Sequence, residues 1–359
     1  YFHDSIGDFR EAERRIITMA KRGRIFAVIF LALLIPVLLA APESEAKVYR
    51  GKCKSNLTWS YDSKTKTMVI DCKGDMPDDE QFYDLDMGWK EYYLKTKKVI
   101  FKKGISSIGS GAFDNFRKLE EIALPEGLRT IKYAAFWDCN SLNKINIPLS
   151  LRKIEKIAFD SSGLTKFSLK NIKKVGSNSF MRSDLVKISI PANCKIGSFA
   201  FWDCKKLKKA TIERGVKNIS DGMFCATALK NITIPGSVTK IGEDAFSYCQ
   251  NLKKATLHEG VKKISKDAFS NTALEEITIP STVTKLGKNA FRWESTEKSS
   301  LKKVVIRSKN IKKWGTMVFG ATRDDLVIYV PQSKKAEYEK ILRSTNGLDF
   351  HAKIVGKKW

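Results

Sequence analysis

The stretch Val238–Pro280, VTKIGEDAFSYCQNLKKATLHEGVKKISKDAFSNTALEEITIP, contains one sequence unit written twice. Each copy reads V-x-K-I-x-x-x-A-F and continues, after a small or polar stretch, with L-x-x-[IA]-T-[IL]. The first copy centres on Phe246 and the second on Phe269. Because the same unit can be followed from residue 105 to residue 331, the sequence predicts a repeat array.

A column of phenylalanines gives the period of the array. Its first nine members lie 21 to 23 residues apart, and the last follows after a step of 28. The column consists of Phe113, Phe136, Phe159, Phe180, Phe201, Phe224, Phe246, Phe269, Phe291 and Phe319. One unit of this size cannot bury its own apolar residues, so about ten units are expected to stack, with parallel strands along one face.

The repeat V-x-x-I-G-x-x-A-F-x-x-C-x-x-L-x-x-I-x-I-P resembles the BspA-type leucine-rich repeat of bacterial surface proteins, and the period falls in the leucine-rich-repeat range. The resemblance covers residues 105–331, and the segment 51–76 is similar to the cap that often precedes such arrays. It implies an α/β-type leucine-rich-repeat solenoid with short parallel strands on its concave face and a small β-rich N-terminal cap. It also implies a secreted or surface-exposed binding protein, often an adhesion protein, and it does not imply catalysis.

The start of the chain predicts export. Met19 is followed by a short basic stretch, by an apolar run over residues 25–41, and by small residues at Ser44 and Ala46. This order is typical of a signal peptide, here over residues 19–46 with cleavage after Ala46. Residues 1–18 are interpreted as an over-extended gene start.

A retained membrane anchor is the alternative interpretation of the apolar run. Its 17 residues lie close to the lower limit for spanning a bilayer. Pro36 and the small residues after the run favour cleavage instead. We therefore expect a secreted or cell-surface protein with no membrane span after cleavage.

Residues 47–104 do not follow the repeat and are predicted to form an N-terminal β cap. Alternation over residues 57–61 and 67–71 predicts a hairpin that covers the open end of the array. Cys53 and Cys72 flank this hairpin, and an exported chain allows a disulfide between them. The sequence leaves that pairing open.

Residues 332–359 are predicted to form a C-terminal cap. The segment 334–344, KKAEYEKILRS, has the pattern of an amphipathic helix with Tyr338, Ile341 and Leu342 facing inward. Residues 350–355 predict a final strand. Together these elements are expected to seal the far end of the array.

The predicted concave face is strongly basic, within a chain of net charge +26. Side chains alternate along a strand, so the residues between the buried ones should form a lysine row beside a hydroxyl row. The candidate binding residues are Lys144, Lys166, Lys187, Lys209, Asn231, Lys254, Lys303, Thr211, Thr233 and Thr256. Such a face suits an acidic protein or an anionic glycan. The alternative is a solvated strand edge on which lysine discourages aggregation.

A second basic column precedes the isoleucine of each unit and is expected to face elsewhere on the solenoid. It includes Arg152, Lys173, Lys217, Lys240, Lys262 and Lys285. Aromatic residues do not interleave with the predicted lysine row, so no specific nucleic-acid partner is expected.

The sequence offers no catalytic constellation. Beyond the signal segment it contains only two histidines, His258 and His351, and no C-x-x-C pair, so neither a metal nor a cofactor is expected. Cys139, Cys204 and Cys249 share one repeat position, where a buried small residue is expected. We therefore expect a monomeric binding or adhesion protein that is not an enzyme. The alternative is a wall-associated protein that binds a polyanion on its own cell surface.

Overall fold

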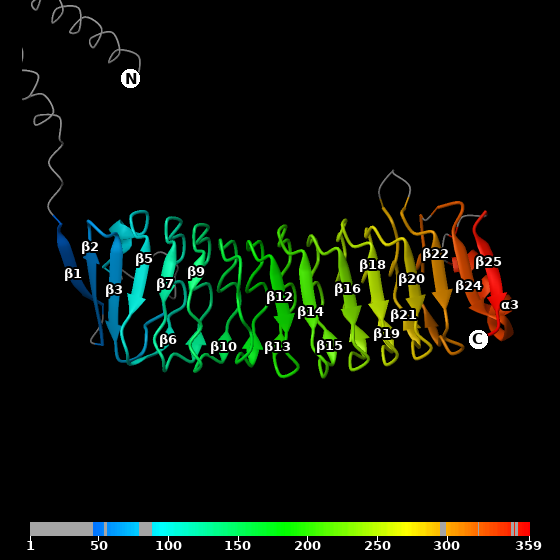
Figure 1. Cartoon of the computed structure of the whole chain (residues 1–359), viewed down its shortest axis with the longest axis horizontal. Coiled ribbons are helices and arrows are strands. Elements are labelled where there is room, and N and C mark those ends of the chain that lie inside the picture. The colour runs from blue at the N-terminus through cyan, green and yellow to red at the C-terminus, as the bar shows by residue number, and fades with distance from the viewer. Residues whose placement is uncertain are drawn as a thin grey trace, which may run out of the picture. The chain divides into compact units, whose positions relative to one another are not determined.

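Short strands succeed one another along the chain and line up on two faces of a solenoid (Figure 1). This computed structural model describes residues 46–53, 56–78, 88–294, 299–321, 323–345, 348 and 351–359. Residues 48–359 form one unit, and the account below concerns that unit. The predicted gene-start extension and all but the last residue of the predicted signal segment lie outside the described residues.

The main face combines the strands predicted from the repeat with strands of the two caps. They are β1 (Val48–Cys53), β2 (Leu57–Asp62), β3 (Thr67–Cys72), β5 (Lys98–Phe101), β7 (Glu121–Ala123), β9 (Lys144–Ile145), β12 (Lys187–Ile190), β14 (Lys209–Ile212), β16 (Asn231–Ile234), β18 (Lys254–Leu257), β20 (Glu276–Ile279), β22 (Lys303–Ile306), β24 (Val327–Pro331) and β25 (Lys353–Lys357). They form three sheets, in the orders β1-β2-β3-β5-β7-β9, β12-β14 and β16-β18-β20-β22-β24-β25. From β3 onward the strand pairs of this face are parallel, as expected for stacked repeats.

A second face, which the sequence did not predict as strands, is built from shorter elements. They are β4 (Gly74–Asp75), β6 (Ile105–Ile108), β8 (Thr130–Ile131), β10 (Lys153–Ile154), β11 (Lys174–Val175), β13 (Lys195–Ile196), β15 (Asn218–Ile219), β17 (Lys240–Ile241), β19 (Lys263–Ile264), β21 (Lys285–Leu286) and β23 (Lys313–Trp314). They form one sheet from β4 to β13 and another from β15 to β23. Of the predicted basic column, Lys240 and Lys285 lie in strands of this second parallel ladder, and the other members each precede a strand by one residue.

The ladders of both faces are interrupted at the same junction. On the main face β14 does not pair with β16, and on the second face β13 does not pair with β15. Across this junction the Phe201 amide donates to the Met223 carbonyl at 3.1 Å. The rings of Phe201 and Phe224 also stack there with centroids 5.6 Å apart.

The phenylalanine column forms a continuous stack of rings through the core. Neighbouring rings lie 5.1–5.7 Å apart at 2–18°. All ten are at most 4% exposed. Trp89, which lies before the repeats, stacks on Phe113 at 5.5 Å and 7° and extends the column by one ring. Each stacked pair stabilises the fold by about 0.5–1.5 kcal/mol beyond burial of its area.

The segment around each ring makes a third ladder between turns. The ring residue donates its amide to the carbonyl of the residue before the next ring, which is alanine in most turns, as Phe136 does to Ala158 and Phe246 to Ala268, both at 2.9 Å. In nearly every turn the residues two before and two after the ring have positive φ, which Asn, Asp and Gly adopt most easily. Ile157 adopts it as well, at φ 63°, although its branched β-carbon opposes this conformation.

The predicted N-terminal hairpin is present as β2 and β3, paired antiparallel with Leu57 opposite Cys72. β1 adds a third strand that the sequence did not predict, with Cys53 opposite the same Leu57. The two cysteines thus lie on the outer strands, about 9.6 Å apart at strand spacing, whereas disulfides need α-carbons within about 7 Å. The disulfide considered from the sequence is accordingly not formed between these two residues.

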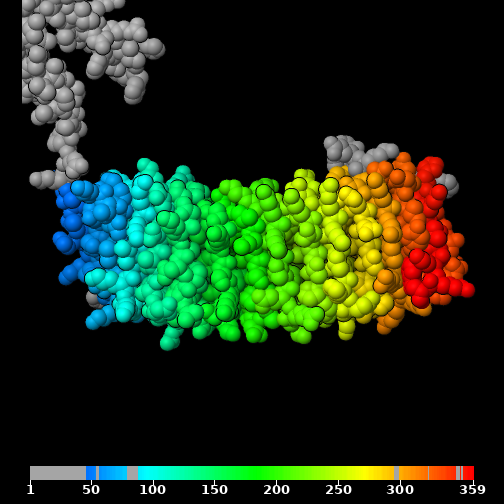
Figure 2. All heavy atoms as spheres, viewed as in Figure 1, coloured from blue at the N-terminus to red at the C-terminus, as the bar shows by residue number. Residues whose placement is uncertain are grey.

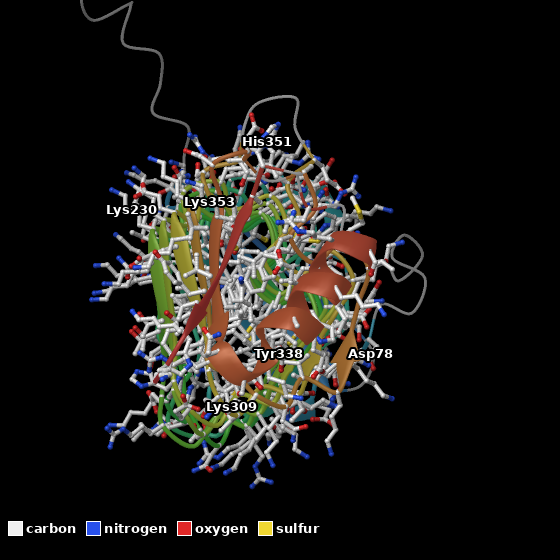
Figure 3. The ribbon with its side chains drawn as sticks, turned by 90° about the vertical axis from the view of Figure 1, so that its right-hand side faces the viewer. Asp78, Lys230, Lys309, Tyr338, His351 and Lys353 are labelled. Carbon is white, nitrogen blue, oxygen red and sulfur yellow. The ribbon has the colours of Figure 1, made fainter. Side chains whose placement is uncertain are left out.

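The C-terminal helix is α3 (Lys335–Thr345), preceded by the 3-10 turn η2 (Gln332–Lys334); another, η1 (Lys90–Tyr92), lies in the N-terminal cap. Figure 3 shows α3 across the end of the array with Tyr338 beneath it. Tyr338 and Leu342 are fully buried, as predicted, while Ile341 is half-buried. The final strand, β25, begins at Lys353, later than the sequence indicates, and Phe350 lies outside the described residues.

Candidate binding surface

The predicted binding lysines lie in register on the main face. Burial alternates along its strands, as in β12, where Lys187 and Ser189 are exposed and Ile188 and Ile190 are buried. Because of this alternation, each turn places an outward-facing side chain at the same position along its strand. The main-face lysine row is Lys144, Lys166, Lys187, Lys209 and Lys254, with Asn231 between the last two. Lys187 pairs with Lys209, and Asn231 pairs with Lys254.

The predicted hydroxyl row runs beside the lysine row. Ser189 pairs with Thr211, and Thr233 pairs with Thr256. Thr211 and Thr233 are exposed, whereas Thr256 is half-buried. The structure therefore brings the predicted hydroxyl and amine side chains onto one face. Figure 3, which looks along the array, places Lys230 on this side and Asp78 on the opposite side.

Carboxylates pair with lysines at both ends of the lysine row. Glu121 lies 2.7 Å from Lys98, whose hydrogen bond holds the pKa of that carboxyl below its usual range. Glu276 lies 3.4 Å from Lys303, so this predicted binding lysine differs from the others in having an acidic partner. Within the described residues, the five lysines of the row between these ends make no ion pair. The unpaired positive charge of this face is therefore concentrated between Lys144 and Lys254.

The second face carries its own lysine row. This row shares Lys240 and Lys285 with the column predicted from the sequence, whereas Lys153, Lys174 and Lys263 each follow a predicted residue by one position. Its members are Lys153, Lys174, Lys195, Lys240, Lys263, Lys285 and Lys313. They pair directly in register, for example Lys174 with Lys195 and Lys263 with Lys285. Among the described residues, two of them have acidic partners, Lys153 with Glu155 and Lys240 with Asp221. The solenoid thus presents two basic strips rather than one (Figure 2 shows the turns as successive bands).

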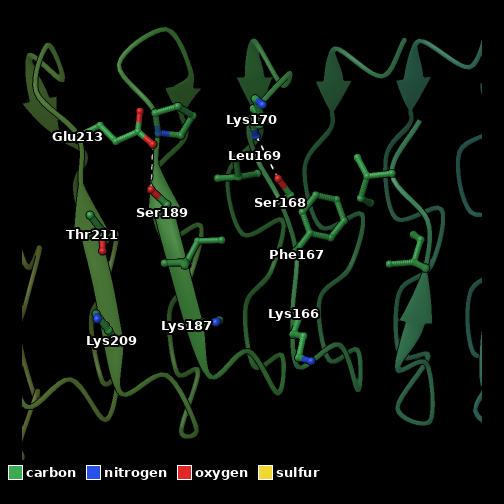
Figure 4. A pocket seen from close by; sticks show the side chains of 14 residues that line it. Lys166, Phe167, Ser168, Leu169, Lys170, Lys187, Ser189, Lys209, Thr211 and Glu213 are labelled. Atoms are coloured by element: carbon green, nitrogen blue, oxygen red, sulfur yellow. Dashed lines mark hydrogen bonds between the residues drawn. The ribbon is translucent and has the colours of Figure 1, made fainter. Parts of the chain in front are cut away.

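A groove of about 840 Å³ crosses the main-face lysine row (Figure 4). Besides Lys166, Lys187 and Lys209 it is lined by Phe167 and Ile145. The sequence analysis did not identify this groove. The available signal was Phe167 itself, an aromatic residue at a strand position that carries Ile, Val or Ala in the other turns of the repeat.

The repeated cysteines are buried side chains within the stack. Cys139, Cys204 and Cys249 are fully buried, and each sulfur lies 3.0–3.2 Å from the carbonyl oxygen of a preceding ring residue. Burial raises the pKa of Cys204 to about 12 and that of Cys249 to about 11. A thiol that stays protonated is a poor nucleophile, so these residues support the stack rather than catalysis.

These three thiols should resist alkylation by iodoacetamide in the native protein between about pH 7 and about pH 9, because the raised pKa keeps the reactive thiolate scarce. An ordinary exposed thiol would become markedly more reactive over the same range. Peptide mass spectrometry after labelling checks this, with the urea-unfolded protein as the fully labelled control. Rapid native labelling of Cys204 or Cys249 would contradict their burial.

Two kinds of site are absent from the part of the chain that the structure describes. No cluster of three or more His, Cys, Asp or Glu side chains is arranged to hold a metal ion there. None of the helices in the same residues combines the length and apolar character needed to cross a bilayer.

The stacked turns with parallel strands define the class of this protein as a leucine-rich-repeat solenoid. A family model for the BspA type leucine rich repeat region matches it in six copies, over residues 91–195 and 173–298. These matches span more than half of the chain, which therefore belongs to the BspA-type leucine-rich-repeat family. Proteins of this family are generally binding scaffolds without enzymatic activity, and membership points to a binding or adhesion role.

The chain is similar to several solved structures at low sequence identity, and the first of them shows the same fold. A leucine-rich repeat protein from Eubacterium ventriosum is 21% identical, with a TM-score of 0.55 over 79% of this chain and 84% of its own. A leucine rich cell surface protein from Faecalibacterium prausnitzii is 19% identical, with a TM-score of 0.42 over 87% and 95%. The pneumococcal vaccine antigen PcpA is 16% identical, with a TM-score of 0.44 over 88% and 99%. No curated protein matches the chain.

Proposed function

We propose that this chain is a secreted or cell-surface binding protein whose main-face lysine row holds an acidic protein or an anionic glycan. The observation that carries the proposal is the row of lysines from Lys144 to Lys254, which make no ion pair within the described residues and of which Lys187 and Lys209 are direct ladder partners. Family membership supports a binding role, and the signal-like segment at residues 19–46 supports export.

The physical argument concerns like charges at short spacing. Neighbouring turns lie about 4.8 Å apart, so lysines directly opposite one another destabilise the ladder by up to about 1 kcal/mol per pair. A bound anion removes this repulsion, and the adjacent hydroxyls of Thr211 and Thr233 can donate to its oxygen atoms. Exposed charge alone gives fast but salt-sensitive binding, whereas added hydrogen bonds make binding persist as salt rises.

The second face favours another candidate function. Its lysine row runs across turn after turn, and five of its seven members make no ion pair within the described residues. A linear polyanion lying along the solenoid would neutralise several of these amines at once. In that case the protein would be a wall-associated polyanion binder retained on its own cell surface.

Two variants of equal charge change separate these functions. In one, Lys144, Lys187, Lys209 and Lys254 of the main face are replaced by serine; in the other, Lys174, Lys195, Lys263 and Lys285 of the second face are replaced. Both remove four surface amines, so differences in binding report position rather than net charge. An array of anionic glycans and matrix proteins is first probed with the full chain to find ligands.

We expect the main-face variant to lose at least about tenfold in affinity, because several charge contacts are removed together, while the second-face variant keeps its affinity. Circular dichroism should show both variants folded, and binding should survive about 0.5 M salt. Equal affinity of the main-face variant and the unaltered chain would reject the proposal. Loss only in the second-face variant, with collapse in salt, would establish the polyanion function instead.

A further inference from the structure

The turn at residues 164–170 departs from the rest of the array. Its burial alternates as in a strand, with Lys166 and Ser168 exposed and Phe167 and Leu169 buried. Yet among the described turns of the repeat it alone contributes no strand to the main face. On that face, one backbone hydrogen bond joins it to a neighbouring turn, from the Val186 amide to the Thr165 carbonyl at 3.1 Å. The ladder is thus open on both sides of this segment.

Two side chains explain the opening. Phe167 occupies a position that is Ile, Val or Ala in the other turns, and its ring lies 5.5 Å from that of Phe159 and 4.8 Å from that of Phe180. A ring at this position keeps its own strand from closing onto its neighbours. In the preceding turn, the side-chain amide of Asn146 accepts a hydrogen bond from the Leu124 amide at 2.6 Å and donates one to the Leu124 carbonyl at 2.7 Å. These bonds hold that turn toward the N-terminal side.

The opening leaves apolar side chains partly exposed. Ile145 and Ile147 are half-buried, whereas Ile188 is 4% exposed and Ile232 is 2% exposed at the matching strand position. The two isoleucines form part of the lining of the groove of about 840 Å³, a volume within the range of binding pockets. Apolar surface that is core elsewhere in the array is available to a ligand here.

Charged and polar groups surround this apolar floor. Figure 4 shows Lys166, Lys187 and Lys209 in a row at one end of the groove, with Lys170 and Glu213 toward the other. The Ser189 hydroxyl donates to Glu213 at 3.0 Å, which occupies that carboxylate. The rim therefore carries four amines against one carboxylate. These four lysines make no ion pair within the described residues, so they remain available to an anionic partner.

We infer that this groove binds an acidic peptide segment that places one apolar side chain on the floor formed by Ile145 and Ile147. The inference rests on the proposed function, of which it names the ligand class and the subsite. Aspartate and glutamate side chains match the surrounding amines, and an aliphatic floor matches an apolar side chain. A sugar would instead favour an exposed aromatic ring, but Phe167 is only 9% exposed.

The test uses two labelled heptapeptides of Asp and Glu that differ only at the centre, which is Phe in one and Ser in the other. Fluorescence polarisation with the full chain should show saturable binding of the Phe peptide and about tenfold weaker binding of the Ser peptide. Lys187→Ser should weaken binding of the Phe peptide by about tenfold. Lys309→Ser removes an exposed amine that belongs to neither the groove nor the main-face lysine row and should leave binding unchanged.

Three results would overturn the inference. Equal binding of both peptides would mean that charge alone is recognised. Equal loss in the two lysine variants would mean that binding follows net charge rather than the groove. Binding of trigalacturonate that is lost in Lys187→Ser, without binding of the Phe peptide, would assign the groove to a glycan. If the main-face variant still loses its array ligand in these cases, the proposed function stands and only the groove assignment fails.

Discussion

Replacement of Phe201 by alanine should lower the free energy of unfolding by about 3–5 kcal/mol. Phe201 is fully buried and stacks between Phe180 at 5.7 Å and Phe224 at 5.6 Å. Its loss removes two stacked pairs and leaves a cavity that the rigid neighbouring rings cannot fill. Urea unfolding monitored by circular dichroism measures the change.

The matched control is Trp202→Ala, one residue further along the same turn. Trp202 is larger than Phe201 but 39% exposed, so its truncation should cost much less than that of Phe201. Hydrogen exchange should show that protection in Phe201→Ala falls first in the turns around residues 180–224, since each turn contacts only its neighbours. Similar losses for both variants would contradict a central role of the ring column.

Replacement of Tyr338 by alanine should destabilise the C-terminal end by about 3–5 kcal/mol. The Tyr338 ring is fully buried and packs edge-on against Trp314 at 5.1 Å. Its hydroxyl accepts from the Ile311 amide and donates to the Ser308 carbonyl, both at 3.2 Å. The loss should appear as faster hydrogen exchange in β24 and β25, while the central turns keep their protection.

Tyr338→Phe separates packing from hydrogen bonding. It keeps the ring and removes only the hydroxyl, which leaves the Ile311 amide and the Ser308 carbonyl without this partner, at a cost of about 1–2 kcal/mol. If the phenylalanine variant were as unstable as the alanine variant, the cap would depend on the hydroxyl rather than on the ring.

Features that follow from the repeat could be predicted from the sequence. The repeat period predicted the positions of the ring column and of the main-face lysines, because the same pattern of residues recurs in each turn. The hairpin of β2 and β3 and the helix α3 have their own local periodicity, and both were predicted. Alternation of polar and apolar residues was not enough to predict strand β1. Its side chains are mostly exposed, and its position depends on pairing with β2.

Features that depend on packing between turns could not be predicted. Trp89 joins the ring column from outside the repeat, and nothing in its local sequence indicates a stacked partner. The groove depends on the size of Phe167 in relation to the rings of Phe159 and Phe180, which only the folded array brings together. The pairing of Lys303 with Glu276 likewise required the register of β20 and β22.

The shared interruption between β13 and β15 and between β14 and β16 gives the solenoid a natural hinge. We expect flexure to cost least where backbone ladders are missing. Here the junction is crossed by the stacked rings, by the third ladder and by the Ser220 hydroxyl, which donates to the Ile196 carbonyl at 2.6 Å. The two segments can therefore tilt against each other about the rings of Phe201 and Phe224 while each keeps its own sheets. We expect a solenoid jointed in this way to adjust its reach to a large or irregular target.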